Sequence, residues 1–484
     1  MGVFVPIDVD TFEGPGWHLR RLAEKLGGRR SRLDRLDSYL RGDPPLPRGA
    51  ESAQSAFRAF QQKARLNMAE LVVEAPRERM KVRAFRTAVD SDETGDDQAW
   101  SIWKANGLTV EMADVWQNML ALGDAYVIVG ADDDGEPVIT GEDPRQVVTM
   151  HDPRRQSRVT SALKMFSAPA EGVDYAYVYL PGRVHVAVRP ASAVPVVSTG
   201  FDGAGWEWDE SRGGEAGEPL PELLADRVPV VRFRNRRGVG EFEPHLDVLD
   251  RINHMILQRM VIATAQAFKQ RAIKGDLPDV DDNGDPIDYD GIFQSGPDAL
   301  WRLPEGVDIQ ELGQADLTPT LLAVRDDLQH LAAVTRTPLS MISPDATNQS
   351  ATGAALIREG LVFKVEDKQA RVDAALIEMM SLAFLMKGDA ARADRGRMSP
   401  EWAPAERYGL AEKFDAVAKA GDRVPDQYLY AEVLQATPEQ VALMTSAARS
   451  AQVRADRSAL VAAAAGARLD PTVARLSERR GVGG

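Results

Sequence analysis

The middle of the chain constrains the fold most, because two apolar helices flank an acidic insertion there. The first predicted helix spans Pro244 to Arg271, and the second spans Pro319 to Thr335. Apolar residues recur at helical spacing in both, and the first is apolar on several faces, so it must be covered on several sides. For either helix alone an ordinary helical core is the simpler interpretation. Together they suit a subunit that builds a wall with other subunits.

A polar loop and a third, longer helix complete this central region. The loop spans Pro338 to Thr352, and the helix spans Gly353 to Lys387, with Gly388 as its predicted C-terminal stop. This arrangement does not favour an enzyme active site, because it consists of a loop between long helices and an insertion at the far end of a helix pair.

The insertion carries most of the negative charge of the chain. Between Asp276 and Glu311 there are eleven acidic residues and one basic residue, Arg302, so this segment holds −10 of the net charge of −15. The acidic balance argues against a protein that grips nucleic acid tightly. We expect a solvated, protruding module, and a docking surface for a basic partner is the alternative.

Part of the insertion matches a calcium-loop template. The matching positions are Asp279, Asp281, Asn283, Gly284, Asp285 and Asp290. Their oxygens would suit a hard cation. However, Asp290 stands where the bidentate Glu belongs, Pro286 interrupts the loop, and no clear helix follows. An acidic turn between strands is therefore the favoured interpretation, and we expect no metal.

The remainder predicts an α+β fold that is mainly α. Four helices are predicted in the first 122 residues: Trp17 to Leu26, Leu33 to Leu40, Ala53 to Leu71, and Thr109 to Leu122. Seven segments with a period of two follow: Ala125 to Val129, Pro137 to Thr140, Gln146 to Met150, Val159 to Phe166, Tyr175 to Leu180, Arg183 to Arg189, and Val228 to Phe233. Asp209 to Asp226 is predicted to be a mobile loop. A capping box at Thr437 opens an alanine-rich helix, and the tail from Gly481 to Gly484 is predicted to be disordered.

Motifs of catalysis and cofactor binding are missing from the sequence. There is no phosphate loop, no complete dinucleotide fingerprint around Gly238-Val239-Gly240, and no nucleophile elbow. The chain has no cysteine, which excludes disulfides and fits an intracellular protein. No uninterrupted apolar run reaches the length of a membrane span. The six histidines show no zinc-binding pair and are expected on the surface or in packing: His18, His151, His185, His245, His254 and His330. We expect no catalytic residue and no cofactor.

Four arginines form a basic cluster just before the first long helix. They are Arg232, Arg234, Arg236 and Arg237. They could contact DNA phosphates, or they could pair with acidic side chains of a neighbouring subunit.

Several segments, in this order, resemble the portal family of tailed phages, specifically siphophages that infect actinobacteria and Gram-positive hosts. No segment is a catalytic signature, and it is their order and spacing that carry the resemblance. They are Leu33 to Gly42, Ala64 to Glu74 with Glu78 to Met80, Leu122 to Val127, Val228 to Phe233, and Pro338 to Ser340 with Asn348 to Leu356.

The resemblance implies a portal fold and a closed ring. It assigns a wing to residues 1–243, stem helices to 244–273 and 318–336, a clip to 274–317, a tunnel loop to 337–352, a spine helix to 353–388, a wing return to 389–424, and a crown to 425–484. Such a subunit would form a dodecamer at one capsid vertex, through which double-stranded DNA is packaged and ejected. It would be a virion protein, assembled in the host cytoplasm.

The resemblance also implies partners and contact residues. The expected partners are other copies of the chain, the major capsid protein, the scaffolding protein, the terminase large subunit, the head–tail adaptor and, non-specifically, DNA. The tunnel loop would touch DNA through Asn348, Gln349 and Ser350. The clip would dock partners through Asp279, Asp281, Asp282, Asp285, Asp288 and Asp290. The alternatives are another virion, tail or scaffolding protein, and an enzyme with an unrecognised site.

Overall fold

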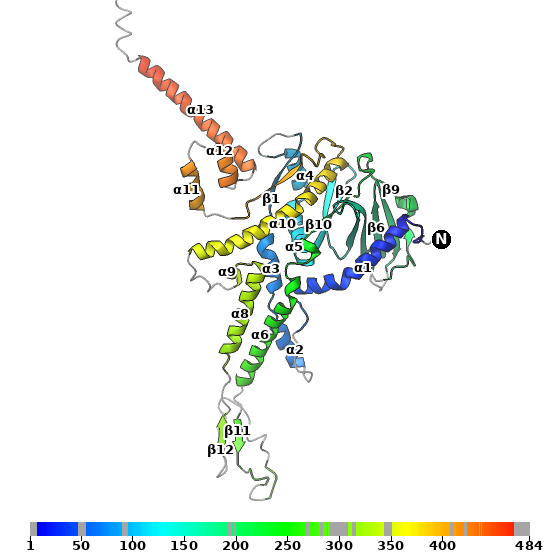
Figure 1. Cartoon of the computed structure of the whole chain (residues 1–484), viewed down its shortest axis with the longest axis vertical. Helices are drawn as coiled ribbons and strands as arrows, with labels where there is room; N and C mark the ends of the chain where they lie inside the picture. The colour runs from blue at the N-terminus through cyan, green and yellow to red at the C-terminus, as the bar shows by residue number, and fades with distance from the viewer. Residues whose placement is uncertain are drawn as a thin grey trace, which may run out of the picture.

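A broad body, a stem and a projecting C-terminal helix make up the molecule (Figure 1). The computed structural model describes residues 7–46, 55–89, 95–191, 196–197, 200–267, 271–275, 277–280, 284–287, 289, 308–311, 316–342, 351–406, 410–420, 424–434, 436 and 438–468. Among the described residues, the body holds most of the helices and three antiparallel sheets. The stem extends from it and ends in a two-stranded ribbon, whereas α13 points away on the opposite side. Helices and sheets in one chain confirm the predicted α+β class.

Two sheets organise the body. The smaller has the strand order β10-β2-β3, formed by Val230–Arg234, Asp124–Ala131 and Pro137–Glu142. The larger runs β4-β5-β6-β7-β8, with β9 also paired to β7. Its strands are Val147–His151, Val159–Ala168, Val173–Leu180, Arg183–Pro190, Glu207–Trp208 and Glu218–Pro219. All seven predicted strands are therefore present, and their ends lie within about two residues of the predicted ones.

Alternating burial explains the larger sheet. In β6 the side chains of Asp174, Ala176 and Val178 are buried on one face. The intervening tyrosines lie on the other face, where the Phe166 ring stacks on Tyr175 with centroids 5.4 Å apart. Because side chains alternate between the faces of a strand, this register gives one core face and one aromatic face.

The first helix corrects one prediction. Two short helices were expected, but α1 is continuous from Pro15 to Leu40. Glycines at 27 and 28 weaken a helix by roughly 1 kcal/mol each relative to alanine. The buried apolar face runs through them from Leu19 and Leu22 to Leu33 and Leu36, so packing outweighs the local preference.

A second correction concerns the expected helix from Ala53 to Leu71. The chain forms α2 (Ser55–Lys63) and α3 (Met68–Arg77) instead. Asn67 caps α3, and its side chain accepts a hydrogen bond from the Glu70 amide at 3.2 Å. A residue that caps one helix has non-helical backbone, so the two helices cannot be continuous.

Several further body elements were not predicted. Helix α4 spans Asp97–Ala105, and β1 (Val82–Arg86) pairs with β13 (Ser399–Trp402) across more than 300 residues of sequence. The expected loop from Asp209 to Asp226 contains short helical turns η1 (Glu210–Arg212), η2 (Gly214–Ala216) and η3 (Glu222–Leu224). Leu224 is fully buried, which ties this segment to the body core.

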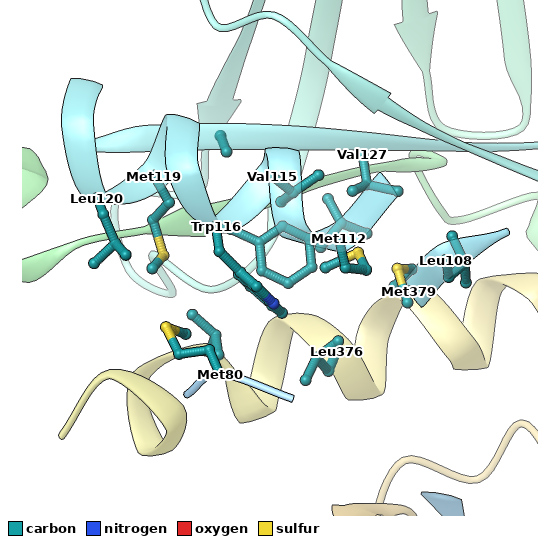
Figure 2. Close-up of a cluster of buried hydrophobic side chains, with 14 of the residues drawn as sticks. Met80, Leu108, Met112, Val115, Trp116, Met119, Leu120, Val127, Leu376 and Met379 are labelled. Carbon is teal, nitrogen blue, oxygen red and sulfur yellow. The ribbon is translucent and has the colours of Figure 1, made fainter. Parts of the chain in front are cut away.

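The main core lies between α5 and α10. Helix α5 spans Leu108–Leu122, as predicted, and α10 spans Ala351–Met386. Figure 2 shows Trp116 of α5 pointing toward α10, where Leu376 and Met379 lie. The Trp116 ring also meets Phe233 of β10 edge-on, with centroids 5.3 Å apart. The longest helix is therefore held by the body core along its second half.

The C-terminal region is helical, as expected. It contains α11 (Leu410–Ala420), α12 (Asp426–Tyr428), a π-helical turn at Leu429–Val433, and α13 (Pro438–Arg468). The predicted tail lies outside the described residues. Among the described residues, no helix has the combination of length and apolar character that crossing a bilayer requires.

Candidate functional site

The stem consists of two helices that lie side by side (Figure 1). Helix α6 (Leu246–Ala267) leads away from the body and α8 (Thr318–Thr335) returns to it. Arg251 of α6 donates to both carboxylate oxygens of Asp327 of α8, at 2.9 and 2.6 Å. This pairing gives Asp327 a structural role at the contact between the two stem helices.

Several large apolar side chains of the stem remain exposed. Leu321 and Leu322 are 47% and 55% exposed at the start of α8, and Val334 is 55% exposed near its end. Val324 and Leu331 of the same helix are buried against the body or α6. A surface helix normally hides its apolar stripe, so these uncovered apolar side chains, which lie on different sides of α8, make the stem a candidate interaction surface.

Hydrogen bonds fix the base of the stem to the body. The Tyr39 hydroxyl of α1 donates to Asp250 of α6 at 2.6 Å, and the Leu66 amide donates to Asn253 at 2.9 Å. Burial and the bond to Asp250 raise the pKa of Tyr39 to about 12. The phenol therefore remains a donor across the physiological range, and the stem leaves the body at a defined angle.

A buried charged cluster joins the body, the stem and helix α10. We call it the junction cluster: Glu241, Lys364, Lys368 and Asn235. The Lys364 and Lys368 ammonium groups lie 2.9 and 2.6 Å from the two carboxylate oxygens of Glu241. Lys364 also donates to the Thr335 carbonyl at the end of α8, at 2.9 Å, and Lys368 donates to Asn235 at 2.7 Å. The groups come from three parts of the chain: the loop after β10, the end of α8, and α10.

Electrostatics inside the junction cluster favours the ionised carboxylate. Burial alone would raise the pKa of Glu241, but the charges of Lys364 and Lys368 outweigh it and lower the pKa to about 2. Burial lowers the pKa of Lys364, and the Glu241 charge opposes that change. Both lysines are only 6% exposed. Neutralising Glu241 would therefore leave two unpaired ammonium groups in the interior, and neutralising the lysines would leave an unpaired carboxylate there.

Close backbone approach places Glu241 in this cluster. The Glu241 amide donates to the Leu120 carbonyl at 2.7 Å, so the loop after β10 packs on the end of α5. A side chain on Gly240 would meet the Ala121 carbonyl oxygen at 2.1 Å, and one on Gly123 would meet the Gly238 carbonyl oxygen at 2.3 Å. The glycines around Val239 therefore serve packing rather than a nucleotide.

The tip of the stem is a short antiparallel ribbon whose first strand lies mostly in the range predicted for the first stem helix and whose second strand lies in the predicted clip. Strand β11 (Arg271–Lys274) pairs with β12 (Asp308–Glu311), so the first stem helix ends before Arg271, where it was predicted to end. Val280 bridges Pro286 in the intervening segment, where Asp279 and Asp285 are exposed. The other predicted docking residues, Asp281, Asp282, Asp288 and Asp290, lie outside the described residues.

The calcium prediction cannot be followed through all of its ligands. Asn283, Asp281 and Asp290 belong to the undescribed residues. Val280 forms an isolated bridge with Pro286, and Gly284 has φ of 87°, so both the calcium site and the acidic turn stay predictions. Within the described part of the chain, no cluster of three or more metal-ligating side chains occurs.

Only the first part of the predicted tunnel loop is described. Arg336 adopts the left-handed conformation, with φ of 54°, and ends α8. A short helix, α9 (Leu339–Ile342), follows, and α10 begins at Ala351. Asn348, Gln349 and Ser350 lie outside the described residues, so their contact with DNA stays a prediction.

The arginine cluster divides into a half-buried member and three exposed members. Arg232 Nε donates to Asp124 Oδ1 at 2.8 Å, within the same chain. Arg234, Arg236 and Arg237 are exposed, and no ion pair within the described segments engages them. Contact with DNA or a neighbouring subunit therefore stays a prediction for these three, and Arg232 is oriented by its own carboxylate.

The junction cluster was missed by sequence reasoning. Its signal was faint: Lys364 and Lys368 lie four residues apart, on the same side of a helix as the buried Leu361, Val365 and Val372. Two lysines on an apolar face require a buried anion. Nothing in the sequence identified Glu241, more than 120 residues earlier, as that anion.

Several known proteins are similar to this chain. The portal protein of Mycobacterium phage D29 is 26% identical over 367 residues, which cover 72% of this chain and 71% of that protein. Among solved structures, the neck of a native gene transfer agent particle with C12 symmetry is 14% identical, with a TM-score of 0.42 over 80% of this chain and 96% of that chain. An HK97 family phage portal protein from Corynebacterium diphtheriae is 12% identical, with a TM-score of 0.34 over 74% and 94%.

The family model of phage portal proteins of the SPP1 Gp6-like type matches residues 20–453, which is most of the chain. A match of this extent includes the body, the stem, the spine helix and the start of the C-terminal helix. The chain therefore belongs to the SPP1 Gp6-like family of phage portal proteins.

Proposed function

We propose that this portal protein forms a dodecameric ring at one vertex of a phage capsid, and that the ring is the channel for DNA packaging and ejection. The observation that carries this proposal is the family match over residues 20–453. The exposed apolar faces of the stem support it, because Leu321, Leu322 and Val334 need a cover that the single chain does not provide. The role is structural, and we expect no catalytic residue.

The ring itself can be tested directly. Purified chain examined by electron microscopy should give closed rings with a central hole. Mass photometry should give a mass of about twelve subunits. A monodisperse monomer at every protein concentration would contradict the proposal.

The tunnel loop is proposed to touch DNA weakly. A channel must let DNA slide, and each cation–phosphate contact adds affinity through counterion release. Asn348, Gln349 and Ser350 offer neutral hydrogen-bonding groups instead. Replacing Asn348 and Gln349 with lysine should slow or block packaging, with the matched Asn348→Ala, Gln349→Ala variant as control. Normal packaging by the lysine variant would contradict this role.

The tip of the stem is proposed to dock the terminase large subunit during packaging and the head–tail adaptor afterwards. Asp279 and Asp285 are exposed beside the ribbon, in a segment with a net charge of −10. Reversing the charges at Asp279, Asp281, Asp282, Asp285, Asp288 and Asp290 should weaken both interactions, measured as pull-down of each partner on intact rings. Unchanged binding of both partners would remove the electrostatic part of this proposal.

Other surfaces are proposed to meet the remaining partners. The body, seated at the capsid vertex, would contact the major capsid protein and, during assembly in the host cytoplasm, the scaffolding protein. The mature location would be the virion. Capsids assembled without the chain should lack DNA, and capsids that still package DNA would contradict the function as a whole.

A further inference from the structure

A cationic site lies where the two body sheets meet near α1. At its centre is Asp124, the first residue of β2, whose side chain is only 7% exposed. Arg29 of α1 donates to one carboxylate oxygen at 3.2 Å, and Arg232 of β10 donates to the other at 2.8 Å. The Arg29 guanidinium also donates to the Tyr126 hydroxyl at 2.8 Å. Both arginines are therefore held in fixed orientations.

Two further basic side chains complete this site. Lys25 donates to the Thr149 carbonyl of β4 at 2.8 Å, which brings its ammonium group to the same place. Burial, together with the charges of Arg232 and Arg29 and then of Arg234, lowers the pKa of Lys25. We define the cationic site as Lys25, Arg29, Arg232, Arg234 and Asp124. Four basic groups stand against one carboxylate, which leaves an excess of positive charge in an acidic chain.

The cationic site also has unused donors and one buried polar atom without a partner. Two arginines that share one carboxylate keep several of their N–H groups available. His151 lies beside them at the end of β4, and its Nδ1 is buried with no hydrogen-bond partner among the described residues. Burial and the charges of Arg232 and Lys25 lower the pKa of His151 to about 4, so it is neutral at pH 7.

The opposite end of β2 carries the opposite charge. The turn between β2 and β3 contains the exposed acids Asp132, Asp133, Asp134 and Glu136, and we call it the acidic turn. Asp132 accepts hydrogen bonds from the Asp134 and Glu136 amides, which fixes the shape of the turn. One base, Lys387, pairs with Glu136 at 2.7 Å. Four carboxylates against one ammonium group mirror the balance of the cationic site.

We infer that the acidic turn of one copy docks into the cationic site of the next copy around the ring. This inference rests on the proposed ring and names an interface within it. Strand β2 has eight residues, so the two charged ends are separated by roughly 25 Å along one rigid strand. Two different, complementary surfaces on each copy produce a heterologous interface, and heterologous interfaces that close give rings.

The matching charges favour a second copy over nucleic acid as the occupant. The cationic site already binds a carboxylate, Asp124, in the geometry that a second carboxylate would use. Asp133 and Asp134 are exposed at the turn, and no ion pair within the described residues engages them. The acidic turn of a second copy carries as many excess negative charges as the cationic site carries excess positive charges, so its binding leaves no net charge at the interface.

A pair of charge-reversed full-length chains tests the interface. One chain carries Lys25→Glu and Arg234→Glu, and the other carries Asp133→Lys and Asp134→Lys. Each chain alone places like charges across every interface, so the concentration needed for ring formation should rise by about tenfold or more. Mixed at equal amounts, the two chains can alternate around a ring with every interface matched, and rings should return. A single chain with all four changes should also form rings.

The readouts are mass photometry and negative-stain electron microscopy over a range of NaCl concentrations. Wild-type rings should assemble less readily as salt rises, because salt screens exposed pairs. Thermal unfolding of each chain checks that it is folded, and Arg449→Glu on the exposed surface of α13 is the matched control, which should assemble as the wild type does.

Each other outcome overturns the inference in a distinguishable way. Rings formed by both reversed chains at the wild-type concentration would show that the two surfaces do not meet. If neither the mixture nor the chain with all four substitutions forms rings, the two surfaces likewise do not meet. Normal rings that lose DNA retention would assign the cationic site to nucleic acid. A wild-type chain that never forms rings would remove the proposed function, and this interface with it.

Discussion

The body and the stem of this portal protein differ in where several of their charged and apolar side chains lie: these are buried in the body and exposed in the stem. In the body, Glu241 and its two lysines are buried and paired, and Trp116 is enclosed between helices and a sheet. In the stem, Leu322 is 55% exposed, and Asp279 and Asp285 of the tip are exposed. The buried side chains of the body therefore stabilise the fold of the single chain. The exposed groups of the stem contribute only when another molecule binds them.

Removing the central aromatic residue of the body should have the largest effect. Trp116→Ala should lower the free energy of unfolding by about 3–5 kcal/mol, because the neighbours in Figure 2 cannot fill the cavity. Urea unfolding followed by circular dichroism measures it. Val110→Ala, on the same helix but 69% exposed, should change stability by less than about 0.5 kcal/mol. Similar losses for both would contradict the assigned core.

Removing the carboxylate of the junction cluster should have the second largest effect on the free energy of unfolding. Glu241→Gln leaves two buried ammonium groups without their anion and should cost about 3 kcal/mol or more. Asp327→Asn breaks a stem pair in which Arg251 is half exposed, and it should cost less than about 1 kcal/mol. Equal costs in urea unfolding would mean that the buried and exposed pairs do not differ.

Acid should act through the same carboxylate. The folded-state pKa of Glu241 is about 2, below its ordinary value of 4.5, so its contribution is fully present above pH 4.5 and is lost as pH falls toward 2. The loss is about 3 kcal/mol on linkage grounds. The difference in stability between the wild type and Glu241→Gln should shrink across that window. A constant difference down to pH 2 would contradict the lowered pKa.

The smallest effect on folding should come from the exposed face of the stem. Leu322→Ala should change the free energy of unfolding by less than about 0.5 kcal/mol but raise the concentration needed for ring formation. Leu331→Ala on the same helix removes a fully buried side chain and should cost about 2–5 kcal/mol. If Leu322→Ala left assembly unchanged, this face would not lie between subunits.

Elements with a long apolar period were predictable, because local spacing alone defines them. The seven predicted β-strands and the helices around Met112, Val324 and Val372 appear close to their predicted ranges. Predictions failed where distant contacts or a single capping residue overrode the local pattern. The α1 glycines are spanned by a continuous buried face, and Asn67 ends one helix by starting another.

The amino-acid sequence by itself predicts an acidic, protruding stem tip and strongly apolar helices. It also shows no catalytic motif. Charge density and periodicity are local properties, so they can be read without the fold. Only the tertiary structure brought Glu241 to Lys364 and Lys368, joined β1 to β13, and placed Arg29 and Arg232 on one carboxylate. These contacts depend on how segments more than 90 residues apart pack together, and no local pattern records which partner a buried charge will meet.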